Sequence, residues 1–157
     1  MATKGEIIEG MRGVQERLDS LLPRATALLD RPLTEGTWSV HDALCHMAAD
    51  ANAFPRWQAR LVAIETGTST RPPGFNLDEF NQQNIDARKG KPVDEVVGEI
   101  KDGLAADVEA MKGVDDAVLS KEIPNFRGEM TTAGAMLLWT TTGHNQVHLD
   151  DIEKALA

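Results

Sequence analysis

Apolar residues near the start of the chain recur at alternating steps of four and three. They are Ile7, Met11, Val14, Leu18, Leu21, Ala25 and Leu28. Steps of this size return to the same side of an α-helix, so the segment has one apolar face that must be buried against other helices. We therefore expect a bundle helix over residues 4–30, with a kink or a break at Pro23.

The same kind of periodicity returns in later segments of the chain. The second helix is expected to start at Ser39, which forms a capping box with Asp42, and to bend at Pro55. Residues 66–76 are dense in glycine, proline and threonine, which predicts a loop. A short helix is expected over residues 77–88.

Two further long helices complete the predicted fold. Pro92 opens a helix that ends at Gly113, the stretch 114–131 is expected to be irregular, and a last helix is expected over residues 132–155. Only 4% of the residues are aromatic and none is tyrosine, which disfavours strands. The sequence therefore predicts an all-α protein: a four-helix bundle with one extra short helix, in a single domain over residues 1–157.

Composition narrows the partners and the compartment. The net charge of −9 argues against a surface that binds phosphates, so no nucleic-acid partner is expected. No apolar stretch approaches the ~20 residues of a membrane span, and the N-terminus lacks the apolar core of a signal peptide. We expect a cytoplasmic protein that acts on a small molecule and has no membrane partner. The single cysteine, Cys45, excludes an internal disulfide framework.

Three of the four histidines are candidate metal ligands. His144 and His148 lie one turn apart on the last predicted helix, so both rings leave one face and can converge on one ion. His46 lies in the apolar second helix, where a divalent metal ion and a carboxylate together satisfy both nitrogens of a buried ring. Two simpler interpretations stay open: the pair lies on a solvated face, and His46 is a core histidine with one backbone hydrogen bond.

Carboxylates close to these histidines in the sequence are candidates for catalysis. Asp50 lies four residues after His46, and Asp151 lies three residues after His148. These two are the candidate general bases at the site. The helix cap explains Asp42 equally well without a functional role, and a solvated face explains Asp151.

Three other side chains near His46 are predicted to have no catalytic role. His41 is turned roughly 140° around the helix from His46 and is expected on the surface. Cys45 is turned about 100° from His46 and is interpreted as a small buried hydrophobe. Trp38 is expected to plug the end of the bundle rather than to stack on a ligand.

Two stretches of the sequence resemble the motifs of a known family. Residues 38–48, WSVHDALCHMA, are similar to the W-S-x-x-x-x-L-x-H-L motif of the DinB/YfiT-like metalloenzymes. Residues 143–152 are similar to the closing H-x-x-x-H-L-x-x-I of that family. The run FNQQN at residues 80–84, followed by a helix with Val93 and Val97, resembles the mycothiol-dependent maleylpyruvate isomerase branch.

The resemblance spans nearly the whole chain and implies a DinB-like four-helix bundle. It also implies a divalent metal ion held by three histidines, and the matching positions are His46, His144 and His148. Zinc or nickel is the expected ion, although imidazole also binds copper and iron. The family further implies a homodimer and a low-molecular-weight thiol cosubstrate such as bacillithiol or mycothiol. Its isomerase branch has a second, C-terminal domain; the sequence ends nine residues after His148, so a two-domain isomerase is not expected.

The leading hypothesis is a metal-dependent transferase that joins a low-molecular-weight thiol to a small electrophile. Three neutral imidazoles leave a coordination position open, as in catalytic metal sites. In that position either a thiol becomes a thiolate or a water molecule becomes acidic. There are three alternatives: a metal-water hydrolase, a metal-binding or ligand-binding bundle without catalysis, and a bundle whose histidines bind nothing. The loop at residues 66–76 is a candidate wall of the substrate pocket.

Overall fold

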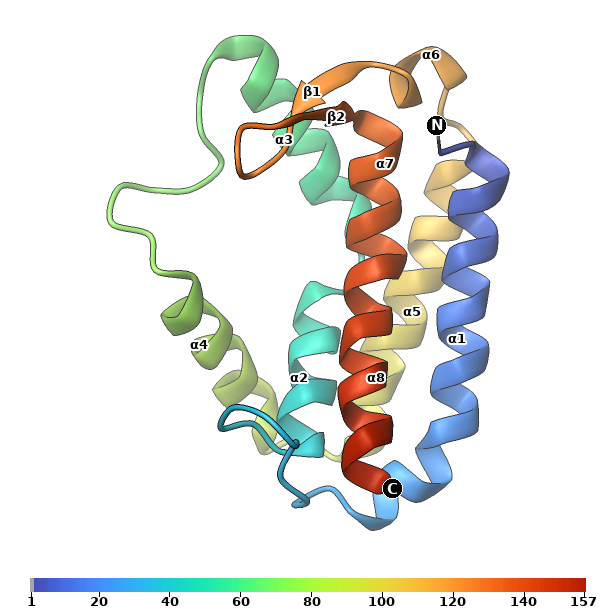
Figure 1. Ribbon diagram of the computed structural model, residues 1–157, viewed down its shortest axis with the longest axis vertical. Coiled ribbons are helices and arrows are strands. Elements are labelled where there is room, and N and C mark those ends of the chain that lie inside the picture. Colours follow the sequence, from blue (N-terminus) through green and yellow to red (C-terminus); the bar gives the residue numbers. More distant parts are fainter. Residues whose placement is uncertain (1) are drawn as a thin grey trace.

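The long helices of the protein run side by side in the computed structural model, which describes residues 2–157 (Figure 1). In chain order the elements are α1 (Lys4–Ala27), α2 (Val40–Asp50), α3 (Phe54–Thr66), α4 (Leu77–Lys89), α5 (Val93–Met111), α6 (Asp116–Leu119), β1 (Glu122–Pro124), β2 (Met130–Thr132), α7 (Ala133–Leu138), η1 (Trp139–Gly143) and α8 (His144–Leu156). Helix α1 contacts α5 and α8, and α2 contacts the same two helices from the other side. This ring of four helices, with α4 as an extra short helix against α2, confirms the predicted fold class.

The apolar face predicted for the first helix lies in the core. Six of its residues are buried: Ile7, Met11, Val14, Leu18, Leu21 and Ala25. The predicted break at Pro23 is wrong, because α1 continues through this residue to Ala27. Only one turn of helix follows Pro23, and the burial of Ala25 in that turn stabilises it against the lost hydrogen bond.

The predicted second helix is two helices, and the expected single bent helix is wrong. α2 ends at Asp50, and Asn52 adopts a left-handed conformation with φ 56°. Pro55 lies in the first turn of α3, where its missing N–H group leaves no hydrogen bond unmade. Asp107 of α5 accepts hydrogen bonds from the backbone nitrogens of Ala53 (2.8 Å) and Phe54 (2.9 Å), and so caps the start of α3.

Burial and hydrogen bonding act in opposite directions on the Asp107 carboxyl group. Burial raises its pKa above the ordinary value, while the two backbone N–H groups lower it. Asp107, which caps α3, lies more than fifty residues away in the sequence. The residues around the α2–α3 break therefore carry no cap signal of their own.

The connections that follow lie outside the ring of long helices. The loop between α3 and α4 arches away from the bundle (Figure 1), and α4 begins and ends within one residue of its predicted limits. The stretch 114–131, expected to be irregular, contains α6, β1 and the start of β2, and β1 pairs with β2 in an antiparallel ladder. Within residues 2–157, no helix is long and apolar enough to cross a lipid bilayer.

Candidate metal centre and adjoining cavity

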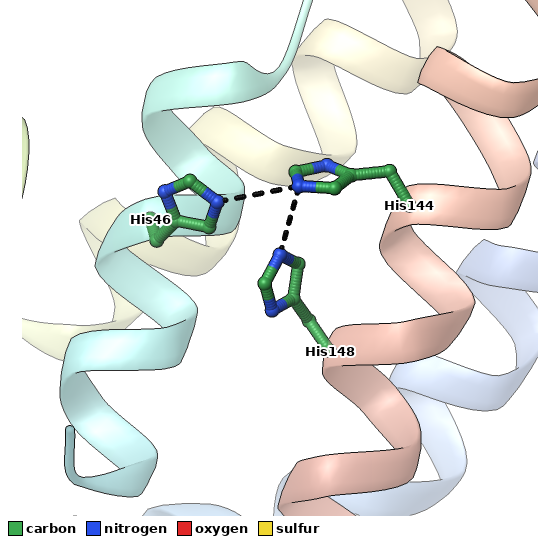
Figure 2. A group of neighbouring side chains, drawn as sticks. All are labelled: His46, His144 and His148. Atoms are coloured by element: carbon green, nitrogen blue, oxygen red, sulfur yellow. Dashed lines mark hydrogen bonds between the residues drawn. The ribbon is translucent and has the colours of Figure 1, made fainter. Parts of the chain in front are cut away.

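The structure brings the three predicted histidines together between α2 and α8 (Figure 2). His144 Nε2 lies 3.5 Å from His46 Nε2 and 3.0 Å from His148 Nε2. Nitrogens bound at about 2.1 Å around one tetrahedral ion lie roughly 3.4 Å apart. These two separations are those expected of ligands of a single ion, and the possible ligand atoms of all three histidines lie within 4.8 Å of one another.

Burial keeps the three imidazole rings neutral at pH 7. Burial, with a smaller contribution from charge on His144, lowers the pKa of His46 to about 4. Burial and the two neighbouring histidines lower the pKa of His148 to about 3. Burial also lowers the pKa of His144, although the Asp50 carboxylate opposes this effect. Neutral imidazole is the form that binds a metal ion.

The residues present fit a divalent metal ion. The Nδ1 atoms of His46 and His148 are buried and have no hydrogen-bond partner among residues 2–157. Ligation through Nε2 leaves the proton of each neutral ring on Nδ1 and turns three lone pairs toward one point. Lone pairs at this spacing repel one another, whereas a single cation accepts all three. We conclude that the chemistry of this donor set suits a cation.

One of the two predicted carboxylates lies beside the three histidines. Asp50 Oδ2 is 3.3 Å from His46 Nε2 and 3.6 Å from His144 Nδ1, and the Asp50 side chain is partly exposed. Asp151 lies on α8 and is half-buried, and its side chain makes no hydrogen bond or ion pair with any residue from 2 to 157. The structure thus brings Asp50, and not Asp151, next to the histidine nitrogens.

The other candidate side chains of α2 and its approach have structural contacts. Asp42 completes the predicted capping box with Ser39 and forms an ion pair with Lys89 at 3.1 Å. Cys45 is fully buried, and burial raises the pKa of its thiol to about 11, so it stays protonated. The half-buried Trp38 ring packs 4.9 Å from the ring of His46. The prediction for His41 needs correction, because His41 is half-buried rather than on the surface.

A π-helical turn, η1, separates α7 from the two histidines of α8. The backbone N–H of His144 donates to the carbonyl of Trp139, five residues earlier instead of four. The extra residue rotates the helix before His144 relative to the helix after it. As a result, Trp139 and Thr140 line a cavity together with His144. A regular helix was expected here, with Trp139 among its apolar residues, but the Trp139 side chain is 55% exposed.

A glycine inside the predicted last helix, Gly143, is the sequence feature that could have indicated this turn. A Cβ atom at Gly143 would lie 2.4 Å from Cε3 of the Trp139 ring. Only glycine therefore allows the indole ring to lie across this turn.

A cavity of about 560 Å³ opens next to the histidines, and His46, Asp50 and His144 form part of its wall. The loop before α4 contributes Arg71 and Phe75, as expected for the segment at residues 66–76. Further wall residues come from α3, from the turn between β1 and β2, and from α7 and η1. No site role was predicted for the wall residues Ala53, Arg56, Trp57, Arg60, Leu77, Phe126, Met136, Trp139 and Thr140.

Comparison with known proteins identifies solved structures that have a similar fold. Neither a family model nor a curated protein matches the sequence. An uncharacterised protein of Clostridium difficile 630 is similar in structure, with a TM-score of 0.70 and 12% identity over 97% of this chain and 94% of that one. The colibactin self-resistance protein ClbS, in complex with a dsDNA, has a TM-score of 0.70 and 18% identity over 98% and 95%.

The mycothiol-dependent maleylpyruvate isomerase is also similar, with a TM-score of 0.69 and 16% identity. The match covers 96% of this chain but only 60% of the isomerase chain. Identities of this size speak for the fold and not for the reaction. The protein therefore has the fold of the DinB-like helical bundles, which its sequence motifs resemble.

Proposed function

We propose that the protein is a metal-dependent transferase that joins a low-molecular-weight thiol to a small electrophile. The observation that carries this proposal is the convergence of three neutral histidine nitrogens at the wall of a cavity large enough for a substrate. A zinc or nickel ion held by His46, His144 and His148 would supply a positive charge that stabilises a thiolate at neutral pH. The thiol class is suggested by the similar isomerase, which is mycothiol-dependent.

Asp50 has the position of the proton acceptor in this reaction. Its carboxylate borders both the histidine nitrogens and the cavity. In the transfer, the thiol proton passes to Asp50 and on to solvent. The sulfur then forms a bond to the electrophilic carbon, and the bond from that carbon to its leaving group breaks, with the electron pair departing on the leaving group.

The test is an assay of the protein loaded with Zn²⁺ or Ni²⁺. Bacillithiol, mycothiol and glutathione are each offered with monochlorobimane, whose chloride is the leaving group. We expect at least one thiol to react faster than without protein, and chelation to abolish the gain. Asp50→Asn should lower kcat about 100-fold or more, since a positioned general base contributes on this scale.

The alternatives predict different outcomes in the same assay. No metal-dependent acceleration with any of the three thiols would contradict the proposal. Ester hydrolysis that needs the metal but no thiol would identify a metal-water hydrolase. Tight metal binding with neither activity would leave a binding protein without catalysis. Asp151→Asn is the matched control, because no hydrogen bond or ion pair joins its side chain to these histidines within residues 2–157, whereas Asp50 lies 3.3 Å from His46 Nε2.

Two expectations about macromolecular partners stay predictions. The ClbS structure contains a dsDNA, whereas this chain carries a net charge of −9 and is expected not to bind DNA. Fluorescence anisotropy with a labelled duplex at low salt tests this, and saturable binding would contradict it. A homodimer is expected because twofold dimers are the commonest oligomers. Light scattering that returns the mass of one chain would contradict the dimer.

A further inference from the structure

The cavity beside the histidines has a positive wall in an acidic protein. The chain has a net charge of −9, yet Arg56, Arg60 and Arg71 all line this cavity. Among the described residues that form the wall, Asp50 is the only carboxylate. The local charge is therefore opposite to that of the protein as a whole, which favours an anionic ligand.

Two of these arginines are oriented by an aromatic ring and not by a carboxylate. The guanidinium carbons of Arg60 and Arg71 lie 5.0 Å and 4.8 Å from the centroid of the Phe126 ring. Neither forms an ion pair with any residue between 2 and 157, and the Nε atom of Arg60 is buried without a hydrogen-bond partner. Arg56 differs, because it donates to the backbone carbonyl oxygens of Asp50 and Ala51.

The cation–π contact with Phe126 uses none of the hydrogen-bond donors of the two guanidinium groups. The N–H donors of a guanidinium form a planar fork. Such a fork matches the paired oxygens of a carboxylate, sulfonate or phosphate. Arg60 and Arg71 contact the same ring and line the same cavity.

Much of the rest of the wall is apolar. Leu77, Phe80 and Trp139 are large hydrophobic side chains that are 46–55% exposed, and all of them line the cavity. A volume of about 560 Å³ lies within the range of small-molecule sites. These side chains suit a ligand with an apolar or aromatic body.

We propose that the cavity binds a small organic anion with an apolar body. Its anionic group lies at Arg60 and Arg71, its body lies against Phe80 and Trp139, and its other end faces His144. This names the substrate class of the proposed transferase and rests on that proposal for the reaction. The binding itself needs no turnover and is measured separately.

Calorimetry with matched ligands tests the proposal. Naphthalene-2-carboxylate and naphthalene-2-carboxamide share one body and differ in charge, and 2-naphthyl phosphate tests a second anionic group. We expect at least one anion to bind about tenfold more tightly than the carboxamide, as hydrogen bonds to charged groups imply. Each titration is run on the zinc-loaded protein and again with EDTA, and the preference should persist in both.

Three variants assign the preference to the arginines. Arg60→Gln and Arg71→Gln should each weaken anion binding about tenfold and leave carboxamide binding unchanged. Arg12→Gln removes the same charge from an exposed position on α1 and should change neither. Arg71 lies in an exposed loop, so its variant remains informative if Arg60→Gln is unstable.

Three results would overturn the inference. They are equal affinity for the anions and the carboxamide, an anion preference that disappears with EDTA, and losses in the two variants no larger than in Arg12→Gln. Each is independent of the thiol assay. A failure here leaves the transferase proposal standing, and a failed thiol assay leaves the anion site standing.

Discussion

Replacing any one of His46, His144 and His148 by alanine is expected to weaken Zn²⁺ binding more than 100-fold. Each ring supplies one of the three nitrogens that converge on a single point, and the loss of an acceptor behind a metal ligand already costs about 10–100-fold. Affinity is measured by competition with a chromophoric chelator. Elemental analysis of protein purified without a histidine tag gives the metal content of the wild type.

The fourth histidine provides the matched control. His41 lies on α2 like His46 but is not part of the cluster, so His41→Ala should keep the affinity of the wild type. A wild type that takes up neither Zn²⁺ nor Ni²⁺, or a His148→Ala variant that binds as tightly as the wild type, would contradict a three-histidine site.

Gly103→Ala is expected to lower the free energy of unfolding by about 3 kcal/mol, at the upper end of typical overpacking costs. A Cβ atom at this position of α5 would lie 2.5 Å from Cβ of Ala51 and 2.6 Å from the backbone nitrogen of Asn52. The segment between α2 and α3 must therefore move outward. Urea denaturation followed by circular dichroism gives the difference.

Gly98 lies on the same helix and separates this effect from helix propensity. Nothing lies within 4 Å of a Cβ atom placed there, so Gly98→Ala should stabilise the protein by up to about 1 kcal/mol. A Gly103→Ala variant as stable as Gly98→Ala would show that the junction after α2 is not packed as described. Because Asp50 ends α2 and lies beside His46, we also expect Gly103→Ala to displace this carboxylate and lower the rate in the thiol assay.

Patterns that repeat within one helix were predicted correctly from the sequence. The apolar residues of α1 and the pair His144 and His148 depend only on helical spacing, which is a local property. The burial of His46 could be predicted because this residue lies in an apolar helix. The fold class followed from the number and length of such segments and from the family motifs.

Features that depend on distant contacts were not predictable in the same way. The break after α2 is stabilised by Asp107, which lies on another helix. The arginine wall of the cavity joins Arg60, Arg71 and Phe126 from three separate segments, and no periodicity links them. Asp50 and Asp151 looked equivalent in sequence, and only the packing of α2 against α8 distinguishes them.

The π-turn η1 has a consequence for how the site can diversify. Each residue added to a helix rotates the following side chains by about 100° around the helix axis. The side chains of α7 can therefore be rotated about that axis independently of those of α8. Insertions or deletions within Trp139–Gly143 rotate the cavity wall of α7 while the spacing of His144 and His148 stays fixed. An insertion or deletion of one residue in η1 can therefore change the cavity wall without changing the spacing of the histidine pair.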